Sequence, residues 1–173
     1  MSENTMAIQT TSTPTSIKVV EPKSLFERIN KMHEKIERRA YEIFRGNGGS
    51  FNHDIDDWFK AEAELLHPVH VNVTEADGAL TAKAEAPGFE AKDLNISLEP
   101  HRLTISGKRE SHKEEKQKGN VVYTERCSNE ILRLVDLPVE IDPAKTTATL
   151  KNGIIELTMP KVAEARKAAV KTA

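Results

Sequence analysis

The spacing of apolar residues changes once along this chain, near Pro68. Before Pro68 the apolar residues recur every three or four positions, which is the period of a helix that buries one face. After Pro68 they alternate with polar residues, which is the period of a strand buried on one side. The pattern therefore predicts a helical segment followed by an all-β domain.

The helical segment divides into two helices around a glycine-rich loop. Ser24 and Glu27 have the spacing of a capping box, which predicts where the first helix begins. The glycines at residues 46–49 end that helix, and a second helix is expected to begin at residues 52–54. The positions expected to form the two apolar stripes are Leu25, Ile29, Met32, Ile36, Ala40, Ile43 and Phe44, and then Ile55, Trp58, Phe59, Leu65 and Leu66.

The all-β domain consists of short alternating runs separated by turn residues. The Asn152-Gly153 pair between the last two runs is a strong hairpin signal, because both residues accept positive φ. A charged interval, Lys108–Lys118, separates two other runs. We expect an all-β core, an immunoglobulin-like antiparallel β-sandwich, preceded by a helix-loop-helix arm. The expected strands are residues 69–73, 80–86, 94–98, 103–105, 121–123, 131–135, 146–150 and 154–159.

Composition limits how much of the chain folds. Of the 173 residues, 38% are hydrophobic and 30% are charged. This composition favours a modest folded module with exposed segments. Its beginning is rich in Ser and Thr, and its end is rich in Ala and Lys. The expected organisation is a disordered segment at 1–23, a helical arm at 24–67, a β-sandwich at 68–160 and a flexible tail at 161–173.

Charge and cysteine content narrow the partners and the compartment. A formal net charge of −2 gives no general attraction to nucleic acid or to acidic membranes, so neither is an expected partner. No apolar run approaches the length that spans a bilayer, and the N-terminus lacks the features of a secretory signal. The single cysteine, Cys127, excludes an intramolecular disulfide. We therefore expect a cytoplasmic protein.

Three clusters that could carry chemistry have simpler interpretations. The glycine-rich loop at residues 46–50 lacks the lysine of a P-loop, so its expected role is to end one helix before the next begins. His67 and His70 could be a metal pair, but no third ligand is near in sequence, and strand-edge residues are the favoured interpretation. The acidic residues at 54–57 suit the start of a helix better than a cation site. We expect no metal, cofactor or catalytic residue.

Two single residues leave alternatives open. Cys127 is either a redox sensor or an inert strand residue, and the second is favoured. Arg133 either binds a substrate or forms an ion pair with an acid on a partner chain, and the ion pair is favoured.

Several motifs resemble those of the small heat-shock proteins, the alpha-crystallin family. The Ala-x-x-x-Asn-Gly-aliphatic-aliphatic segment at residues 148–155 looks like the signature of that family. The Ala86-Pro-Gly-Phe89 loop, the strand at residues 103–110 and the Leu137-Pro138 pair resemble further family motifs, in the same order. Together they cover roughly residues 68–160. The helices are similar to a small bacterial module without an established role, in the segment from Arg39 to Leu65.

The resemblance implies a stress-response chaperone that works without ATP. Such a holdase binds partly unfolded proteins and prevents their aggregation, and it assembles with itself as a homodimer or a larger oligomer. The alternative is a CS-domain-like co-chaperone or scaffold, which shares the sandwich but docks one dedicated partner. An enzyme ranks third, because no catalytic set converges in the sequence.

The resemblance also suggests where each contact would form. The edges of two strands would make a peptide-binding groove, with Leu94, Ile96 and Leu98 on one wall and Thr147 and Thr149 on the other. The alternative is that these apolar residues simply fill the core, and both can hold. The charged interval would carry a strand to a partner's first strand, so the expected dimer interface is Val69, Val71, Val73, Val121, Val122, Tyr123 and Arg133. The alternative is a local hairpin within one chain, with a flexible charged tip. Val170 is the plausible remnant of a tail anchor. The expected client-binding residues of the arm are Phe26, Ile29, Met32, Ile36, Tyr41, Phe44, Trp58 and Phe59.

Overall fold

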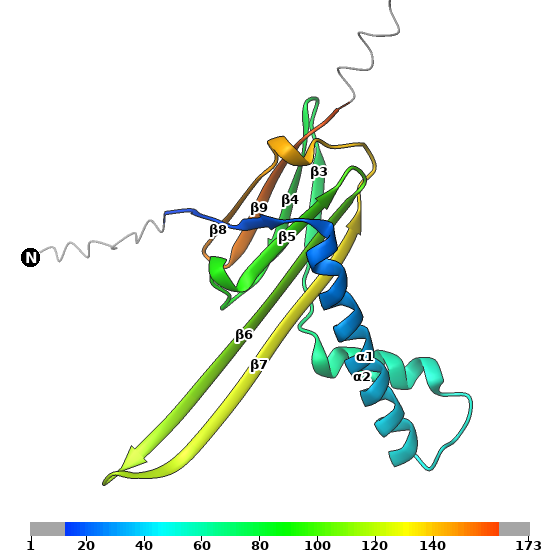
Figure 1. Ribbon diagram of the computed structural model, residues 1–173, viewed down its shortest axis with the longest axis vertical. Coiled ribbons are helices and arrows are strands. Elements are labelled where there is room, and N and C mark those ends of the chain that lie inside the picture. The colour runs from blue at the N-terminus through cyan, green and yellow to red at the C-terminus, as the bar shows by residue number, and fades with distance from the viewer. Residues whose placement is uncertain (1–12, 163–173) are drawn as a thin grey trace, which may run out of the picture.

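Two β-sheets form a sandwich, and a pair of helices lies beside it (Figure 1). The computed structural model describes residues 13–162, apart from the side chains of residues 113–117 and 120–128. One sheet has the strand order β1-β8-β9-β4-β3, and the other has the order β2-β5-β6-β7. The elements are β1 (Thr15–Ser16), β2 (Lys18–Val20), α1 (Pro22–Gly46), α2 (Asp54–Leu65), β3 (Val71–Glu75), β4 (Ala79–Glu85), β5 (Leu94–Glu99), β6 (Arg102–Gln117), β7 (Asn120–Asp136), β8 (Thr147–Lys151) and β9 (Ile154–Pro160), with short 3₁₀ helices at Ala91–Asp93 and Pro143–Lys145.

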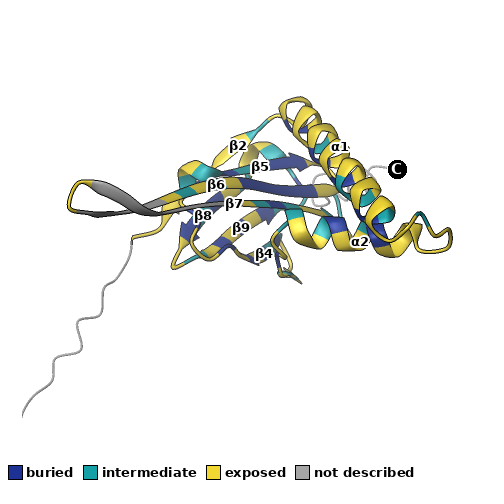
Figure 2. Ribbon diagram, turned by 90° about the horizontal axis from the view of Figure 1, so that it is seen from below, coloured by how far each residue is buried: buried dark blue, intermediate teal, exposed yellow. Residues whose placement is uncertain are grey.

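The core lies between the two sheets and is built from alternate residues of each strand. Leu80 and Leu157 from one sheet and Ile96 and Ile105 from the other are completely buried. Figure 2 shows buried positions concentrated in the strands, while most of the surface of α1 is exposed. Burying one such side chain contributes about 1.5–3 kcal/mol, so this alternation largely determines the fold. The predicted β-sandwich is confirmed.

The Asn-Gly turn forms as the sequence predicts. Asn152 has a φ of 51° and Gly153 a φ of 74°, and Lys151 pairs directly with Ile154. Two positive φ angles between paired strands are the mark of a type I′ turn. The backbone N–H of Ala86 donates a hydrogen bond to the carbonyl oxygen of Gly153 at 2.8 Å. The turn is therefore held against the proline-glycine loop that follows β4.

The charged interval is part of a strand, which corrects the sequence prediction. β6 continues through it to Gln117, and β7 pairs with β6 along its whole length (Figure 1). The turn between them contains Lys118 and Gly119, both with positive φ. A ladder of main-chain hydrogen bonds needs no burial, and the register sets Lys108 opposite Glu130, a favourable cross-strand pair. The absence of apolar alternation therefore did not exclude a strand here.

The first helix starts earlier than predicted. α1 begins at Pro22, whose fixed φ suits the first turn of a helix. The hydroxyl of Ser24 donates to the carbonyl oxygen of Glu21 at 2.8 Å, so Ser24 is not the N-cap and the predicted capping box is wrong. The expected apolar stripe is confirmed, because its members are buried or half-buried: Leu25, Ile29, Met32, Ile36, Ala40, Ile43 and Phe44.

The second helix turns a different face inward than the sequence suggests. Ile55 and Phe59 are exposed, while Asp57 and Ala61 are buried. The side-chain amide of Asn47 donates to the Asp57 carboxylate at 3.2 Å, which gives this buried acid a hydrogen-bond partner. The small side chain of Ala61 lets α2 lie close to α1. The predicted stripe residues Trp58, Leu65 and Leu66 are half-buried and pack against this contact, so only Ile55 and Phe59 of the stripe are left in solvent.

Residues 13–21, the described part of the segment before α1, contain two short strands, although the sequence analysis predicted disorder over residues 1–23; residues 1–12 lie outside the described part. Residues 15–20 form β1 and β2, and Ile17 between them is 4% exposed. A branched aliphatic run between Pro14 and Pro22 was the available signal, since β-branched residues favour strands.

Candidate functional site

The two strands expected to form a peptide-binding groove lie at the same side of the sandwich. β8 and β5 would be the end strands of their sheets without residues 15–20, which we call the N-terminal strand segment. β1 pairs antiparallel with β8, and β2 pairs parallel with β5. The edge groove, defined by β5, β8 and the space between them, is therefore filled by the chain itself.

The predicted wall residues of the edge groove divide into two groups. Leu94, Ile96 and Leu98 are buried and belong to the core. Thr147 is exposed and Thr149 is half-buried, and Thr149 lies opposite Ser16 in the register. The leucines and isoleucine form the floor beneath the N-terminal strand segment, and the threonines lie at its side. The assignment of these residues to peptide binding stays a prediction.

A cavity lies beneath the start of α1, on the face of the β5 sheet that points away from the sandwich core, because its lining residue Ser97 alternates with the core residue Ile96. It has a volume of about 490 Å³ and lies between the start of α1 and the sheet that contains β5. Phe26, Ile29 and Leu134 supply apolar surface to it, and Ser97 and Glu99 of β5 line its other side. Phe26 and Leu134 are both largely exposed.

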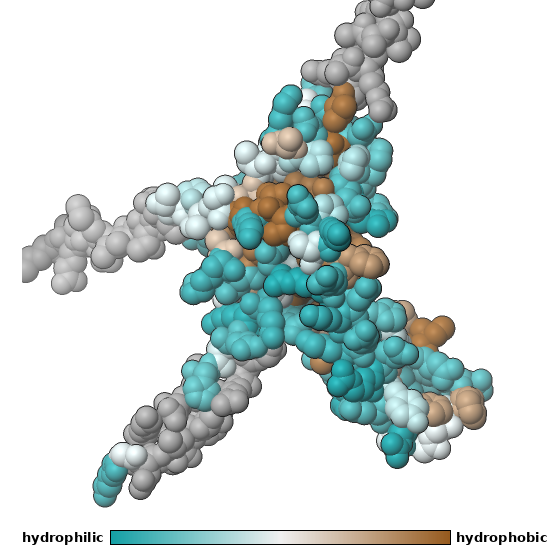
Figure 3. Space-filling model, viewed as in Figure 1, coloured by the Kyte–Doolittle hydropathy of each residue, from teal (hydrophilic) through white to brown (hydrophobic). Residues whose placement is uncertain are grey.

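The helical arm presents several large apolar side chains to solvent. Tyr41, Phe51, Ile55 and Phe59 are 60–77% exposed. The Phe44 ring contacts both neighbours, with centroid separations of 6.4 Å to Tyr41 and 5.9 Å to Phe51. Figure 3 shows hydrophobic residues at the lower right, over this arm. Such a patch on a folded module is typical of an interaction surface.

Only some of the predicted arm residues reach solvent. Phe26, Tyr41 and Phe59 are exposed, whereas Met32 and Ile36 are buried between the helices and β7. Trp58, Ile29 and Phe44 are half-buried. Met32 and Ile36 therefore hold the arm together, and in this conformation they are too deeply buried to contact a client. Phe51 and Ile55 are exposed residues that the client-binding prediction missed.

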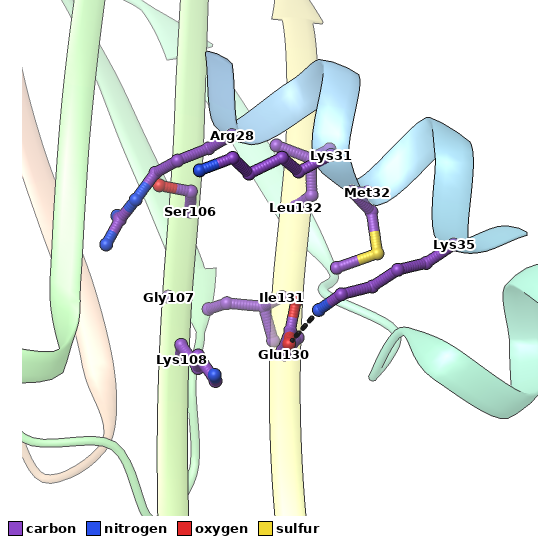
Figure 4. A pocket seen from close by; sticks show the side chains of 10 residues that line it. All are labelled: Arg28, Lys31, Met32, Lys35, Ser106, Gly107, Lys108, Glu130, Ile131 and Leu132. Carbon is purple, nitrogen blue, oxygen red and sulfur yellow. Dashed lines mark hydrogen bonds and ion pairs between the residues drawn. The ribbon is translucent and has the colours of Figure 1, made fainter. Parts of the chain in front are cut away.

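The arm is tied to the sandwich by an ion pair beside a small cavity. Lys35 of α1 donates to the Glu130 carboxylate of β7 at 2.9 Å (Figure 4). The cavity, of about 230 Å³, is lined by α1, β6 and β7 and also contains Arg28, Lys31 and Lys108. Lys108 is itself paired with Glu110 at 2.8 Å, and this hydrogen bond raises the pKa of Lys108. Among the residues drawn, the Lys35–Glu130 pair is therefore the attractive charge contact between α1 and the hairpin.

A second ion pair links the two helices. Arg39 of α1 donates to the Glu64 carboxylate of α2 at 2.6 Å and to Glu42 at 3.0 Å. The hydrogen bond from Arg39 lowers the pKa of Glu64, and the same bond raises the pKa of Arg39. Both groups are solvent-exposed, so the pair orients the helices more than it stabilises them.

The predicted dimer residues lie on an open edge and on the long hairpin. β3 is the last strand of its sheet among the described residues. Val69 is buried just before β3 begins, while Val71 and Val73 are half-buried on it. Arg133 is exposed on β7. Within the described chain, residues 121–123 lie in the local hairpin, so pairing with another chain stays a prediction.

The remaining candidates do not converge on a site. His67 and His70 are exposed and line an open pocket of about 630 Å³ beside Phe59 and Arg133. Within residues 13–162, no three metal-binding side chains of the described set lie close enough to hold an ion. The side chain of Cys127 and the whole of Val170 lie outside what is described. No helix of the described part is long and apolar enough to span a membrane.

Two family models match this chain. The model described as the Hsp20/alpha crystallin family matches residues 72–172, which include most of the sandwich. The model described as a protein of unknown function, DUF2934, matches residues 31–67, which include most of α1 and all of α2. The boundary between the two matches lies at the predicted change of period.

Individual proteins show the same likeness. The small heat shock protein C2 of Rickettsia felis is 36% identical over 90 residues, which are 52% of this chain and 58% of that protein. The chain therefore spans less than two thirds of that relative. The 17.8 kDa class I heat shock protein of Arabidopsis thaliana is 32% identical over 142 residues, which are 76% of this chain and 87% of the relative. The solved structure of heat shock protein 16.0 from Schizosaccharomyces pombe is 29% identical, with a TM-score of 0.44 over 56% of this chain and 88% of that one.

Proposed function

Because the chain belongs to the Hsp20/alpha crystallin family, we propose that it is a chaperone that binds partly unfolded proteins without ATP and limits their aggregation. It acts in the cytoplasm, on unrelated clients, and forms no covalent bond with them. Binding an unfolded chain shields the apolar surface that would otherwise drive aggregation, and mass action alone supplies the effect.

The observation that carries this proposal is the exposed aromatic surface of the helical arm. Tyr41 and Phe59 project from the two packed helices and Phe51 from the loop that joins them, so an already folded support presents the three rings to solvent. Aromatic rings offer apolar area without demanding one shape of partner. This surface supports binding to many clients better than docking of one dedicated partner.

Self-association completes the proposal. We propose a homodimer in which the β6–β7 hairpin of one chain reaches the open β3 edge of the other. Hydrogen-bonded and non-hydrogen-bonded pairs alternate along two antiparallel strands. The N–H of Ala76 donates to the carbonyl oxygen of Ala79 at 2.9 Å, so the alternation places Val71 and Val73 at non-hydrogen-bonded positions of β3. Their N–H groups therefore point away from β4. Those N–H groups are then free to pair with a second chain, in a reciprocal twofold arrangement.

Heat-induced light scattering of three unrelated client proteins tests the chaperone proposal. The assay contains the full chain and apyrase, so that no ATP remains. We expect suppression of scattering for all three clients. Suppression of one client alone would favour a dedicated co-chaperone, and suppression only after ATP is restored would refute the proposal.

A triple variant tests the surface that carries the proposal. Replacing Tyr41, Phe51 and Phe59 with Ser removes aromatic area without opening the core, and it should weaken suppression at least fivefold. The matched control replaces three exposed charged residues of the same helices, Glu34, Glu37 and Lys60, with Ser. Equal activity of the two triple variants would show that the arm is not the client surface.

A further inference from the structure

A group of cations surrounds the small cavity between α1 and the β6–β7 hairpin, which we call the basic cavity. Arg28, Lys31 and Lys35 come from α1, and Lys108 comes from β6. Glu130 is the one acidic residue among the described residues that line the cavity. The lining therefore carries an excess of positive charge, although the formal net charge of the whole chain is −2.

The three cations of α1 lie on one face of the helix. Residues 28, 31 and 35 are spaced by three and four positions, and residues with that spacing are neighbours on a helix surface. Met32 is buried, in a cluster against which Leu132 of β7 packs. Figure 4 shows the Arg28 and Lys31 side chains extending from α1 across β6, while Lys35 reaches Glu130. The packing of α1 on the sheet thus sets where these charges lie.

Two of the cations have no acidic partner within the described part of the chain. Lys108 is paired with Glu110 at 2.8 Å, whereas Arg28 and Lys31 form no ion pair with a described residue. The hydrogen bond with Glu110 is the main cause of the raised pKa of Lys108, and the positive charge of Arg28 opposes that rise. Arg28 and Lys108 are therefore close enough to repel each other, and an anion between them would turn this repulsion into attraction.

A buried hydroxyl group lies on the floor of the basic cavity. Ser106 of β6 is 5% exposed, and it alternates with the core residue Ile105, so its side chain is on the side of the strand that faces α1. Within the described residues, its Oγ atom has no hydrogen-bond partner. Buried polar groups are nearly always hydrogen-bonded, so this hydroxyl indicates a place where a ligand oxygen would complete the site. A serine hydroxyl can donate a hydrogen bond to such an oxygen.

The size and charge of the basic cavity indicate the kind of anion. Its volume of about 230 Å³ is smaller than the roughly 300–1,000 Å³ of pockets that enclose drug-sized ligands. Its four cations, set against Glu130 and the Glu110 that pairs with Lys108, leave an excess of two positive charges. A phosphate group carries about two negative charges at neutral pH and several strong acceptor oxygens. Arginine, lysine and a hydroxyl are donors that suit such oxygens.

We propose that the basic cavity is a phosphate-binding site. Arg28 and Lys31 donate charge-assisted hydrogen bonds from α1, Lys108 adds its charge from β6, and the Ser106 hydroxyl donates to one phosphate oxygen. The ligand is a phosphate group with two negative charges, either free or at the end of a small ester. A bound phosphate would join the helical arm to the sandwich, because its ligands come from both. This inference goes beyond the proposed chaperone function, and neither requires the other.

Isothermal titration calorimetry of the full chain tests the site directly. Inorganic phosphate and glycerol 3-phosphate are titrated separately at pH 7.5, with ionic strength held constant by sodium chloride. We expect saturable binding of one equivalent, with a Kd below about 1 mM for at least one of the two. Tighter binding of inorganic phosphate would assign the site to the free anion, and tighter binding of the ester would assign it to an esterified group. Absence of saturable binding of both would overturn the inference.

A pair of serine variants tests the buried hydroxyl. Ser106→Ala removes the donor on the cavity floor and should weaken phosphate binding at least fivefold. The matched control is Ser97→Ala, because Ser97 is also buried, is on the same face of the sheet and lines the other cavity beneath α1. It should change the affinity less than twofold. Equal affinities of the two variants would contradict the proposed site.

A pair of double variants tests the charges. Arg28→Gln with Lys31→Gln should weaken phosphate binding at least tenfold. Both side chains are exposed, so the fold should survive. The control, Lys23→Gln with Arg38→Gln, removes two other exposed cations of α1 that do not line the basic cavity. Equal weakening by the two double variants would show that phosphate responds only to the general charge of the helix, and it would overturn the inference.

Thermal denaturation gives a second measurement on the same proteins. A ligand that binds only the folded chain stabilises it, so phosphate at ten times its Kd should raise the melting temperature of the unmodified chain by about 3–6 °C. The control double variant should show the same rise, and the Arg28→Gln, Lys31→Gln variant should show none. An equal rise for all three proteins would exclude the basic cavity as the place where phosphate binds.

Discussion

Gly153 lies directly against Pro87, so that a Cβ atom at Gly153 would come within 3.3 Å of the Pro87 Cα. This contact joins the Asn-Gly turn between β8 and β9 to the loop that follows β4. The turn and the loop, which are more than sixty residues apart in sequence, thus form one end of the sandwich. The hydrogen bond from the N–H of Ala86 to the carbonyl oxygen of Gly153 holds the two segments together.

Replacing Gly153 with Ala should destabilise the fold. The residue has a φ of 74°, which costs an L-residue about 1–2 kcal/mol, and the new methyl group would press on backbone atoms of Pro87. Urea denaturation measures the loss. The control is Gly78→Ala, because no heavy atom lies within 4 Å of its Cβ position. Equal losses for the two variants would show that the contact is unimportant.

Truncation of Leu157 tests whether the alternation of β9 determines the core. Leu157 is completely buried, so Leu157→Ala should cost about 2–5 kcal/mol of unfolding free energy. Ile154 begins the same strand and is 44% exposed, so Ile154→Ala should cost less than about 1 kcal/mol. Thermal or urea denaturation compares them. A larger loss for Ile154→Ala would contradict the inward and outward assignment of this strand.

Strands β8 and β9 show which features of the fold the sequence could predict. Alternation identified the buried faces because the sandwich core is apolar on one side of each strand, and Asn152-Gly153 identified its turn because few residue pairs tolerate two positive φ angles. The same alternation did not indicate the continuation of β6 through the charged interval to Gln117, because strands held by main-chain pairs alone need no apolar period. It also missed the strands around Ile17, because the branched aliphatic run at residues 17–20 is too short to establish a period.

The helical arm shows the opposite limitation. Periodicity placed α2 but assigned Ile55 and Phe59 to its buried side, since apolar residues were expected to be buried. The neighbouring helix packs on the strip around Ala61 instead, and Asp57 is buried because Asn47 provides a hydrogen-bond partner. Which side of a helix faces its neighbour depends on the angle of approach, and the spacing of residues does not specify that angle.

The open edge of β3 leads to a prediction about the oligomer. Val73→Pro removes an N–H that faces away from β4, so the sandwich should survive while pairing with a second chain is lost. Sedimentation at micromolar concentration should show monomers for this variant and dimers for the unmodified chain. A folded dimer of Val73→Pro would refute the use of this edge.

The hairpin supplies the other half of that contact and can be tested separately. The register shifts beside Lys116, so that Val121 and Tyr123 have partners on β6 and Val122 is the extra residue of a bulge. Proline is tolerated at a bulge, so Val122→Pro should preserve the local hairpin and yield monomers. Retention of the dimer by Val122→Pro would exclude strand pairing through this segment.

The Arg39–Glu64 pair predicts a specific titration. The hydrogen bond from Arg39 lowers the pKa of Glu64, so the stabilisation from this pair is present at neutral pH and is lost as pH falls through that lowered pKa. Carboxyl NMR should show the pKa of Glu64 below the ordinary range, and Arg39→Gln should return it there. Arg38→Gln removes the adjacent exposed arginine as a control. A Glu64 pKa unchanged by Arg39→Gln would show that the pair does not persist in solution.

The most direct test of the proposed chaperone function is whether the chain holds a non-native client in a soluble complex. A client protein is heated with the full chain and apyrase, cooled, and separated by size-exclusion chromatography, and the eluted species are weighed by native mass spectrometry. We predict a soluble species that contains both proteins and forms with several unrelated clients. Recovery of the chain alone, with every client in the aggregated fraction, would contradict the proposed chaperone function.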